Sequence, residues 1–238
     1  MSSLSGLLED LADATASLIA DARGLTDELA RGPSLLPGWT RGHVLTHLAR
    51  NAEGGTRLLN GARAGEPGYQ YRSAEERAAA IEAGAGRPAA VLVTDLRASA
   101  AAFLQAAALM PADAWDHQVT WTSGHCGPAA DVPPARLTEV QIHHVDLNLG
   151  FGPADWPAAW AGEMLGELTR QVAEEAPRLS GRLRAADTGR SFRLGGGAGG
   201  SGEITGTEAE LLAWLLGRSD GAGLARNVAG PLPSVPSF

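Results

Sequence analysis

Residues 36–49 read LPGWTRGHVLTHLA, and they predict a loop that runs directly into a helix. Proline and glycine near the start of this stretch favour irregular backbone. Thr40 follows them and can cap the helix, because its hydroxyl can accept a hydrogen bond from a free backbone N–H of the first turn. The helix then has an apolar stripe to bury, formed by Val44, Leu45 and Leu48.

Two pairs of potential metal ligands stand four residues apart on predicted helices. His43 and His47 form one pair, and Glu139 and His143 form the other, with His144 adjacent. Residues four apart share a helix face, with Cβ atoms about 6 Å apart. Glu139, His143 and one histidine of the first pair would make the His2Glu set that catalytic zinc sites use, which leaves a fourth position open.

Spacing alone leaves this assignment open. It does not choose between His43 and His47, nor between His143 and His144, and such pairs also arise by chance in helical proteins. The apolar neighbours of His47 indicate that its ring points inward. A buried imidazole needs a polar partner, and a metal is one of several that would serve.

The segments around these pairs predict a helical first domain, residues 1–150. Apolar periodicity indicates a first helix from Leu4 that ends by Gly32, and a long helix that begins near Pro88. A short helix is expected over 73–84 and the fourth long helix over 135–149. Four long helices favour a bundle, in which metal sites form between facing helices.

The pattern changes after Gly150. A helix is expected over 156–176, followed by short strands at 181–186, 191–194 and 203–205. Thr207 can cap a last helix that ends near Leu216. The chain is therefore expected to be α+β, with a smaller α+β domain over residues 151–238.

The charge composition narrows the chemistry. All 19 basic residues of the 238 are arginine, and the net charge is −8. This balance argues against a nucleic-acid-binding surface, which needs clustered positive charge. The lack of lysine excludes Schiff-base chemistry and the P-loop lysine. Any substrate carboxylate would have to be bound by arginine.

The remaining composition favours a cytoplasmic protein. Cys126 is the only cysteine, so no intramolecular disulfide can form, as is usual in a reducing compartment. We find no apolar run near the roughly 20 residues that span a bilayer, and no signal peptide. We therefore expect no membrane association, and we expect a monomer.

Three stretches resemble the mycothiol-dependent maleylpyruvate isomerase family, which belongs to the wider DinB-like four-helix-bundle metalloproteins. Residues 36–49 resemble its signature, and residues 137–147, LTEVQIHHVDL, resemble its second metal-bearing helix. Residues 215–221, LLGRSDG, resemble a motif of its C-terminal domain. The three stretches occur in the family's order and span almost the whole chain.

The resemblance implies zinc ligands at His47, Glu139 and His143. It leaves His43 at a position where the family varies, so that residue would support the site or the fold. Arg218 falls on the arginine thought to bind the substrate's carboxylate. The alternative is an arginine that meets the end of a helix dipole. Arg77 also matches a family position that could face the cleft, against the alternative of a solvated helix arginine.

The function implied is a zinc-dependent cis–trans isomerase that converts maleylpyruvate, a small dicarboxylate, to fumarylpyruvate. A thiolate would add to the conjugated double bond, allow rotation and leave again. The thiol would be a cofactor, mycothiol by resemblance, with ergothioneine also compatible, so Cys126 would not be the working sulfur. The alternatives are a thiol S-transferase acting on an electrophile, and a non-catalytic metal- or small-molecule-binding module.

Overall fold

The computed structural model describes residues 3–175, 179–195 and 202–234. The chain divides into two compact units, Met1–Gly150 and Phe151–Phe238. The first is helical apart from one small hairpin, and the second combines a mixed sheet with helices. The α+β class expected from the sequence is therefore confirmed.

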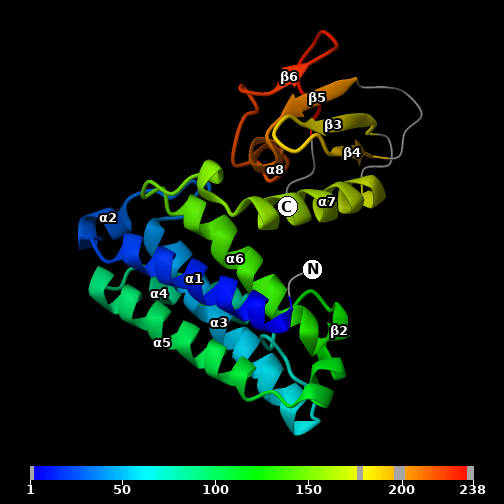
Figure 1. Cartoon of the computed structure of the whole chain (residues 1–238). Helices are drawn as coiled ribbons and strands as arrows, with labels where there is room; N and C mark the ends of the chain where they lie inside the picture. The colour runs from blue at the N-terminus through cyan, green and yellow to red at the C-terminus, as the bar shows by residue number, and fades with distance from the viewer. Residues whose placement is uncertain (1–2, 176–178, 196–201, 235–238) are drawn as a thin grey trace. The chain divides into compact units, whose positions relative to one another are not determined.

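Four long helices build the first unit (Figure 1). They are α1 (Leu4–Ala22), α3 (Arg41–Ala64), α5 (Ala89–Ala108) and α6 (Val132–Asp146). Helices α3 and α1 each pack on both α5 and α6, which closes the four into a ring. Helix α4 (Ala74–Ala85) packs on the outside of α3. The core between the helices is rich in fully buried leucine.

The shorter elements of this unit correct two sequence-based expectations. The first helix does not continue to Gly32: it ends at Ala22, and a separate helix α2 (Asp27–Arg31) follows. The side chain of Thr26 accepts a hydrogen bond from the N–H of Leu29 and so starts α2 afresh. Cys126 lies in an antiparallel hairpin, formed by β1 (Gln118–Thr120) and β2 (Cys126–Pro128), within a unit that was expected to be helical. Two 3-10 helices, Ala112–Asp116 and Ala129–Asp131, flank it.

Hydrogen bonds join the start of α3 and the loop before it to the end of α6. Arg41 donates from Nε to the carbonyl of Leu147 at 2.7 Å, and from Nη2 to the carbonyl of Asn148 at 3.2 Å. The N–H of Leu35 donates to the carbonyl of Asp146 at 2.9 Å. The two helices are therefore antiparallel, and the early turns of α3 lie opposite the late turns of α6.

Gly42 explains why a glycine stands in the loop-to-helix stretch. A Cβ at this position would lie 2.2 Å from the carbonyl oxygen of Ala85, the last residue of α4. No side chain fits in that space, because the obstacle is backbone and cannot rotate away. Gly42 thus permits the close approach of α4 to α3.

Helix α5 differs from the expectation that no apolar run reaches membrane-spanning length. Its 20 residues are long and apolar enough to cross a bilayer by length and composition alone. The alanine-rich sequence produces this result, and the face that carries Leu92, Leu96 and Phe103 is buried in the bundle. A core helix of a bundle has this character.

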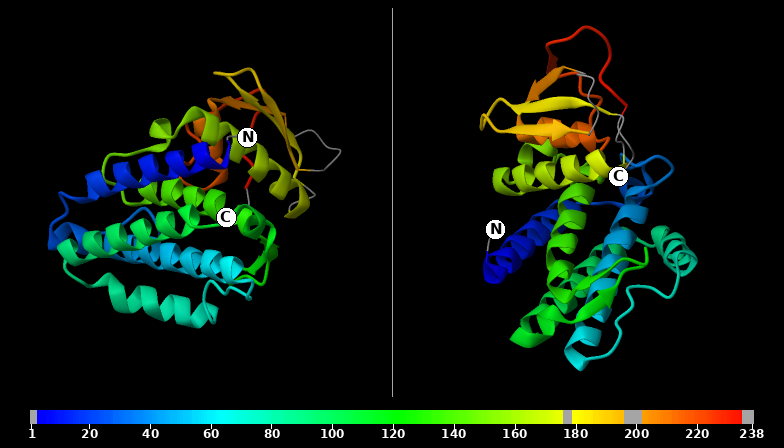
Figure 2. Two further views of the ribbon diagram at one scale, coloured as in Figure 1. Left: turned by 60° about the horizontal axis from the view of Figure 1, so that its bottom comes forward. Right: turned by 90° about the vertical axis from the view of Figure 1, so that its right-hand side faces the viewer.

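The second unit pairs a four-stranded sheet with two helices. The strand order is β4 (Ser191–Leu194), β3 (Gly181–Ala185), β5 (Glu203–Gly206), β6 (Ala225–Arg226). Strands β3 and β5 are parallel, and the outer pairs are antiparallel. Helix α7 (Ala158–Glu175), preceded by a 3-10 turn at Pro153–Asp155, packs on β4 and on α8 (Glu208–Leu215) (Figure 2). Strand β6 was not expected, and the predicted helix end at residue 176 lies outside the described residues.

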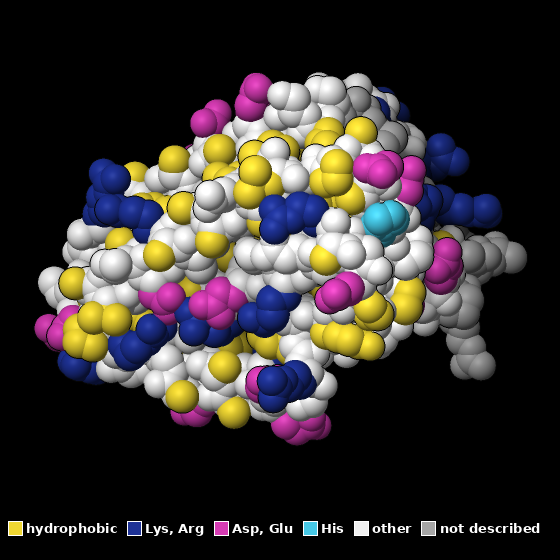
Figure 3. Space-filling view, turned by 90° about the horizontal axis from the view of Figure 1, so that it is seen from below, with side chains coloured by type: hydrophobic (Ala, Val, Ile, Leu, Met, Phe, Trp, Pro, Cys, Tyr) yellow, Lys and Arg dark blue, Asp and Glu magenta, His cyan; other side chains and the backbone are white. Residues whose placement is uncertain are grey.

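The face seen in Figure 3 carries charges of both signs. On the face seen in Figure 3, arginine side chains are interspersed with aspartate and glutamate side chains, and apolar side chains lie singly or in small groups between them.

Candidate metal centre

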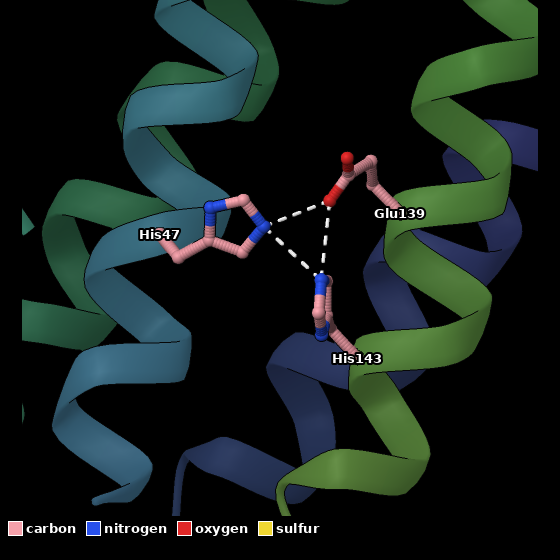
Figure 4. A group of neighbouring side chains, drawn as sticks. All are labelled: His47, Glu139 and His143. Atoms are coloured by element: carbon pink, nitrogen blue, oxygen red, sulfur yellow. Dashed lines mark hydrogen bonds and ion pairs between the residues drawn. The ribbon is translucent and has the colours of Figure 1, made fainter. Parts of the chain in front are cut away.

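His47, Glu139 and His143 converge between α3 and α6 (Figure 4). His47 stands in the second turn of α3, and the other two stand one turn apart in the second half of α6. Because the two helices are antiparallel and fastened at this end, the three side chains reach a common point. One ligand atom from each lies within 4.8 Å of the others.

The three atoms are close enough to share one cation. Nε2 of His47 lies 2.8 Å from Oε2 of Glu139 and 3.1 Å from Nε2 of His143. Nε2 of His143 lies 3.2 Å from the same oxygen of Glu139. A tetrahedral zinc ion with ligands at about 2.1 Å sets its ligand atoms about 3.4 Å apart. The donor set therefore fits zinc after small side-chain movements, and it leaves the fourth position open.

The protonation states of the three residues are unequal. Burial lowers the pKa of His47, although the carboxylate of Glu139 opposes this effect. Burial also acts to raise the pKa of Glu139, but hydrogen bonds from the two histidines hold that pKa well below its usual value. Glu139 is thus ionised at neutral pH, and its side chain, 32% exposed, is the most open of the three.

His143 is held from behind by Asp146. Its Nδ1 donates to Oδ2 of Asp146 at 2.8 Å, and the Asp146 side chain is fully buried. Burial acts to lower the pKa of His143, but the hydrogen bonds to Asp146 and Glu139 outweigh it and raise that pKa. A carboxylate behind a ligand histidine fixes its tautomer and aims Nε2 at the metal.

His47 has different neighbours. Nη2 of Arg77, on α4, donates to its Nδ1 at 3.1 Å, and the Trp39 ring lies 5.7 Å from its ring, edge to face. Arg77 is half-buried. The interpretation of Arg77 as a solvated helix arginine is therefore wrong, and the alternative that faces the cluster is the one the structure has.

The histidines that spacing could not separate have other partners. His43 accepts the N–H of Thr40 at Nδ1, which completes a capping box, and its Nε2 lies 3.2 Å from Glu82. His144 points toward α1, where its Nε2 lies 2.8 Å from Oδ2 of Asp21. His47 and His143 are consequently the members of each pair that meet Glu139.

The remaining candidates lie elsewhere. Arg218 belongs to the second unit, just after α8, and its Nη1 donates to the carbonyl of Leu216 at 2.7 Å. This bond to the helix C-cap matches the alternative interpretation of that residue. Cys126 and His125 are exposed on the hairpin, and His117 donates to the carbonyl of Ala62.

Sequence reasoning missed two supports of the cluster. Asp146 stands three residues after His143, a spacing that places both on one helix face and could have indicated the pair. The second support is Trp39, whose ring lies against both His43 and His47. That contact depends on the path of the loop before α3, for which the sequence carries no periodic signal.

Comparison with known proteins identifies the family to which this chain belongs. A crystal structure of a mycothiol-dependent maleylpyruvate isomerase matches with a TM-score of 0.93 at 25% identity, over 100% of this chain and 98% of that one. A histidine-to-alanine mutant of such an isomerase matches with the same score and coverage at 24% identity. No curated protein sequence matches. The family model described as the mycothiol maleylpyruvate isomerase N-terminal domain matches residues 11–148, more than half of the chain, and the chain therefore belongs to this family.

Proposed function

We propose that this chain is a zinc- and thiol-dependent cis–trans isomerase that converts maleylpyruvate to fumarylpyruvate. The observation that carries the proposal is the convergence of His47, Glu139 and His143 in a member of this family. Two imidazoles and one carboxylate suit zinc, and three protein ligands leave room for a ligand.

The chain's own residues would bind the zinc ion and set the protonation states of its ligands. A zinc ion bound by His47, Glu139 and His143 would supply positive charge that favours the thiolate form of a thiol. The thiol would supply the nucleophile, whose sulfur adds to one carbon of the cis double bond and leaves after rotation. Asp146 keeps the proton of His143 on Nδ1, so that Nε2 faces the centre. Glu139 is ionised at neutral pH because its pKa is held low.

Arginine would bind the dianionic substrate, as the absence of lysine requires. Arg77 is the first candidate, because its guanidinium already reaches the ring of His47. Arg218 is the second, by its match to the family motif in residues 215–221. A planar guanidinium can donate two parallel hydrogen bonds to one carboxylate. Mycothiol is the thiol that family membership favours, and ergothioneine is compatible with the same metal ligands.

The test is a panel of thiols with maleylpyruvate on zinc-supplemented protein. Loss of the enol absorbance of maleylpyruvate is followed, and the product and thiol are then identified by mass spectrometry. Formation of fumarylpyruvate with the thiol returned unchanged supports the proposal. A stable thioether product would show an S-transferase instead, and no reaction with any thiol would reject both the isomerase and an S-transferase that acts on maleylpyruvate.

A further inference from the structure

A cavity lies beside the candidate metal centre formed by His47, Glu139 and His143, within the first unit. Its volume is about 180 Å³, and Glu139 forms part of its wall. A single water needs only about 10–15 Å³ by this measure, so the cavity has room for a small organic molecule. Phe103 and Val132 give it apolar walls, while Asn51 and Gln70 add polar groups.

Arg136 brings a buried positive charge to this cavity. It stands one turn before Glu139 on α6, lines the cavity and is 4% exposed. Its Nη1 donates to the carbonyl of Leu48 at 2.9 Å and to Oδ1 of Asn51 at 2.8 Å. Its Nη2 is buried and has no hydrogen-bond partner among the described residues. Burial lowers the pKa of Arg136 to about 10, so the group remains a cation at neutral pH.

A guanidinium that lines a cavity and keeps one nitrogen without a hydrogen-bond partner calls for an anion. Burying a charged donor without a partner is costly, and such groups in native proteins are usually completed by a ligand or ordered water. Within the part of the chain that the structure describes, Arg136 forms no ion pair with an acidic side chain. Glu139 acts on Arg136 electrostatically, but both histidines already engage its Oε2.

The hydroxyl of Tyr71 is a second incomplete polar group in this region. It is buried and has no hydrogen-bond partner among the described residues. Burial raises the pKa of Tyr71, and its electrostatic neighbours include Arg77 and Glu139. Tyr71 would therefore be a neutral donor at physiological pH, next to the same cluster.

We propose that this cavity binds a carboxylate of a small-molecule ligand, and that Nη2 of Arg136 donates to it. The inference rests on the proposed function for the source of the carboxylate, which is either the dicarboxylate substrate or a carboxylate-bearing thiol such as ergothioneine. The ligand would enter past Ala135 and Ser123, the exposed members of the cavity wall. Its carboxylate would then lie one helical turn from Glu139, with the rest of the molecule beside the metal cluster.

The experiment measures binding without turnover. Zinc-supplemented protein is titrated calorimetrically with maleate, with ergothioneine and with maleamide, the uncharged counterpart of maleate. The variants are Arg136→Met, which removes the charge, and Ala135→Phe, which narrows the entrance and leaves Arg136 in place. Arg97→Met is the matched control, because Arg97 is exposed on α5 and lies outside the cavity wall.

We expect Arg136→Met and Ala135→Phe to weaken binding of at least one carboxylate probe tenfold or more, and Arg97→Met to leave it unchanged. Weaker binding of maleate to the variants identifies the substrate as the source of the carboxylate. Weaker binding of ergothioneine identifies the thiol as the source. Should Arg136→Met not fold, Ala135→Phe decides. The proposal is overturned if both probes bind the variants as they bind the wild type, or if the wild type binds neither maleate in preference to maleamide nor ergothioneine. Either result leaves the isomerase assay unaffected, so the two proposals fail separately.

Discussion

Asp146 lies directly behind His143, fully buried, and accepts the proton of its Nδ1 at 2.8 Å. A metal ion that displaces the proton on Nε2 would leave the one proton of the neutral imidazole on Nδ1, where this bond holds it, so that Nε2 is free to bind the metal. Among the described residues no comparable carboxylate stands behind His47, whose Nδ1 accepts from Arg77 instead. The two histidines of the candidate metal centre therefore differ in the hydrogen bond at Nδ1, which His143 donates to Asp146 and His47 accepts from Arg77.

Replacing Asp146 by asparagine should weaken zinc binding. The variant keeps the shape of the side chain but removes the charge that orients and polarises His143, and losses of this kind are about 10–100-fold in metal affinity. Competition with a chromophoric chelator measures the effect. Asp113→Asn, on an exposed side chain of the same unit, serves as the control. Equal affinities for all three proteins would show that Asp146 does not support a ligand.

Replacing Arg77 by methionine should move metal binding and turnover in opposite directions. For zinc to bind at Nε2, a neutral His47 must carry its proton on Nδ1, where the N–H of Arg77 now points. Removal of this competing donor, and of a positive charge beside a cation site, should raise zinc affinity by up to about tenfold.

Turnover of maleylpyruvate by Arg77→Met should fall in the same samples, because Arg77 is proposed to bind the substrate. Zinc affinity and the rate at saturating zinc are measured in parallel. If the variant binds zinc more weakly than the wild type, Arg77 does not compete with zinc binding at His47, and the prediction is wrong.

Zinc affinity should depend on pH through His143. Its pKa is raised, so near pH 6.5 the metal must displace a proton from this ring, whereas His47, with its lowered pKa, is already neutral. Glu139 is ionised throughout. Affinity should therefore rise about tenfold per pH unit until the pH exceeds the raised pKa of His143.

The variant Asp146→Asn provides the internal check on this pH dependence. The hydrogen bond to Asp146 is one cause of the raised pKa of His143, so its weakening should shift the profile to lower pH. Calorimetry in buffers of different ionisation enthalpy counts the protons released. A flat profile in the wild type would mean that no proton competes with the metal at His143.

Gly42→Ala should destabilise the helical unit. The new Cβ would lie 2.2 Å from the carbonyl oxygen of Ala85, and overpacking against backbone costs about 2 kcal/mol, or about 4–8 °C in melting temperature. Gly24→Ala is the matched control, because its Cβ would meet nothing within 4 Å. A melting temperature for Gly42→Ala equal to that of the control would show that α4 does not approach α3 so closely.

The sequence predicted the long helices of the bundle more completely than the residues of the candidate site. Helical spacing predicted the long helices and the pair Glu139 and His143, because both depend on neighbours along one helix. It could not choose His47 over His43, since that choice depends on Thr40 and Glu82, which take both ring nitrogens of His43. The resemblance of residues 36–49 supplied the choice that spacing lacked.

Other features depend on how distant segments meet. Arg77 reaches His47 only because α4 packs on α3, and Arg136 faces a cavity whose walls come from several elements. A solvated arginine and a buried one look alike in a helical sequence. The break between α1 and α2 was missed for a local reason, because Thr26 and the acidic residues after it start a new helix within an apolar pattern.

The central claim is that His47, Glu139 and His143 form one zinc site, and elemental analysis of the zinc-loaded, desalted protein tests it most directly. The wild type and His43→Ala should each retain about one zinc per chain, since a three-ligand site binds one ion. His47→Ala should retain none, with its helical circular dichroism unchanged. Retention of a full equivalent of zinc by His47→Ala, or of none by the wild type, would contradict the assignment.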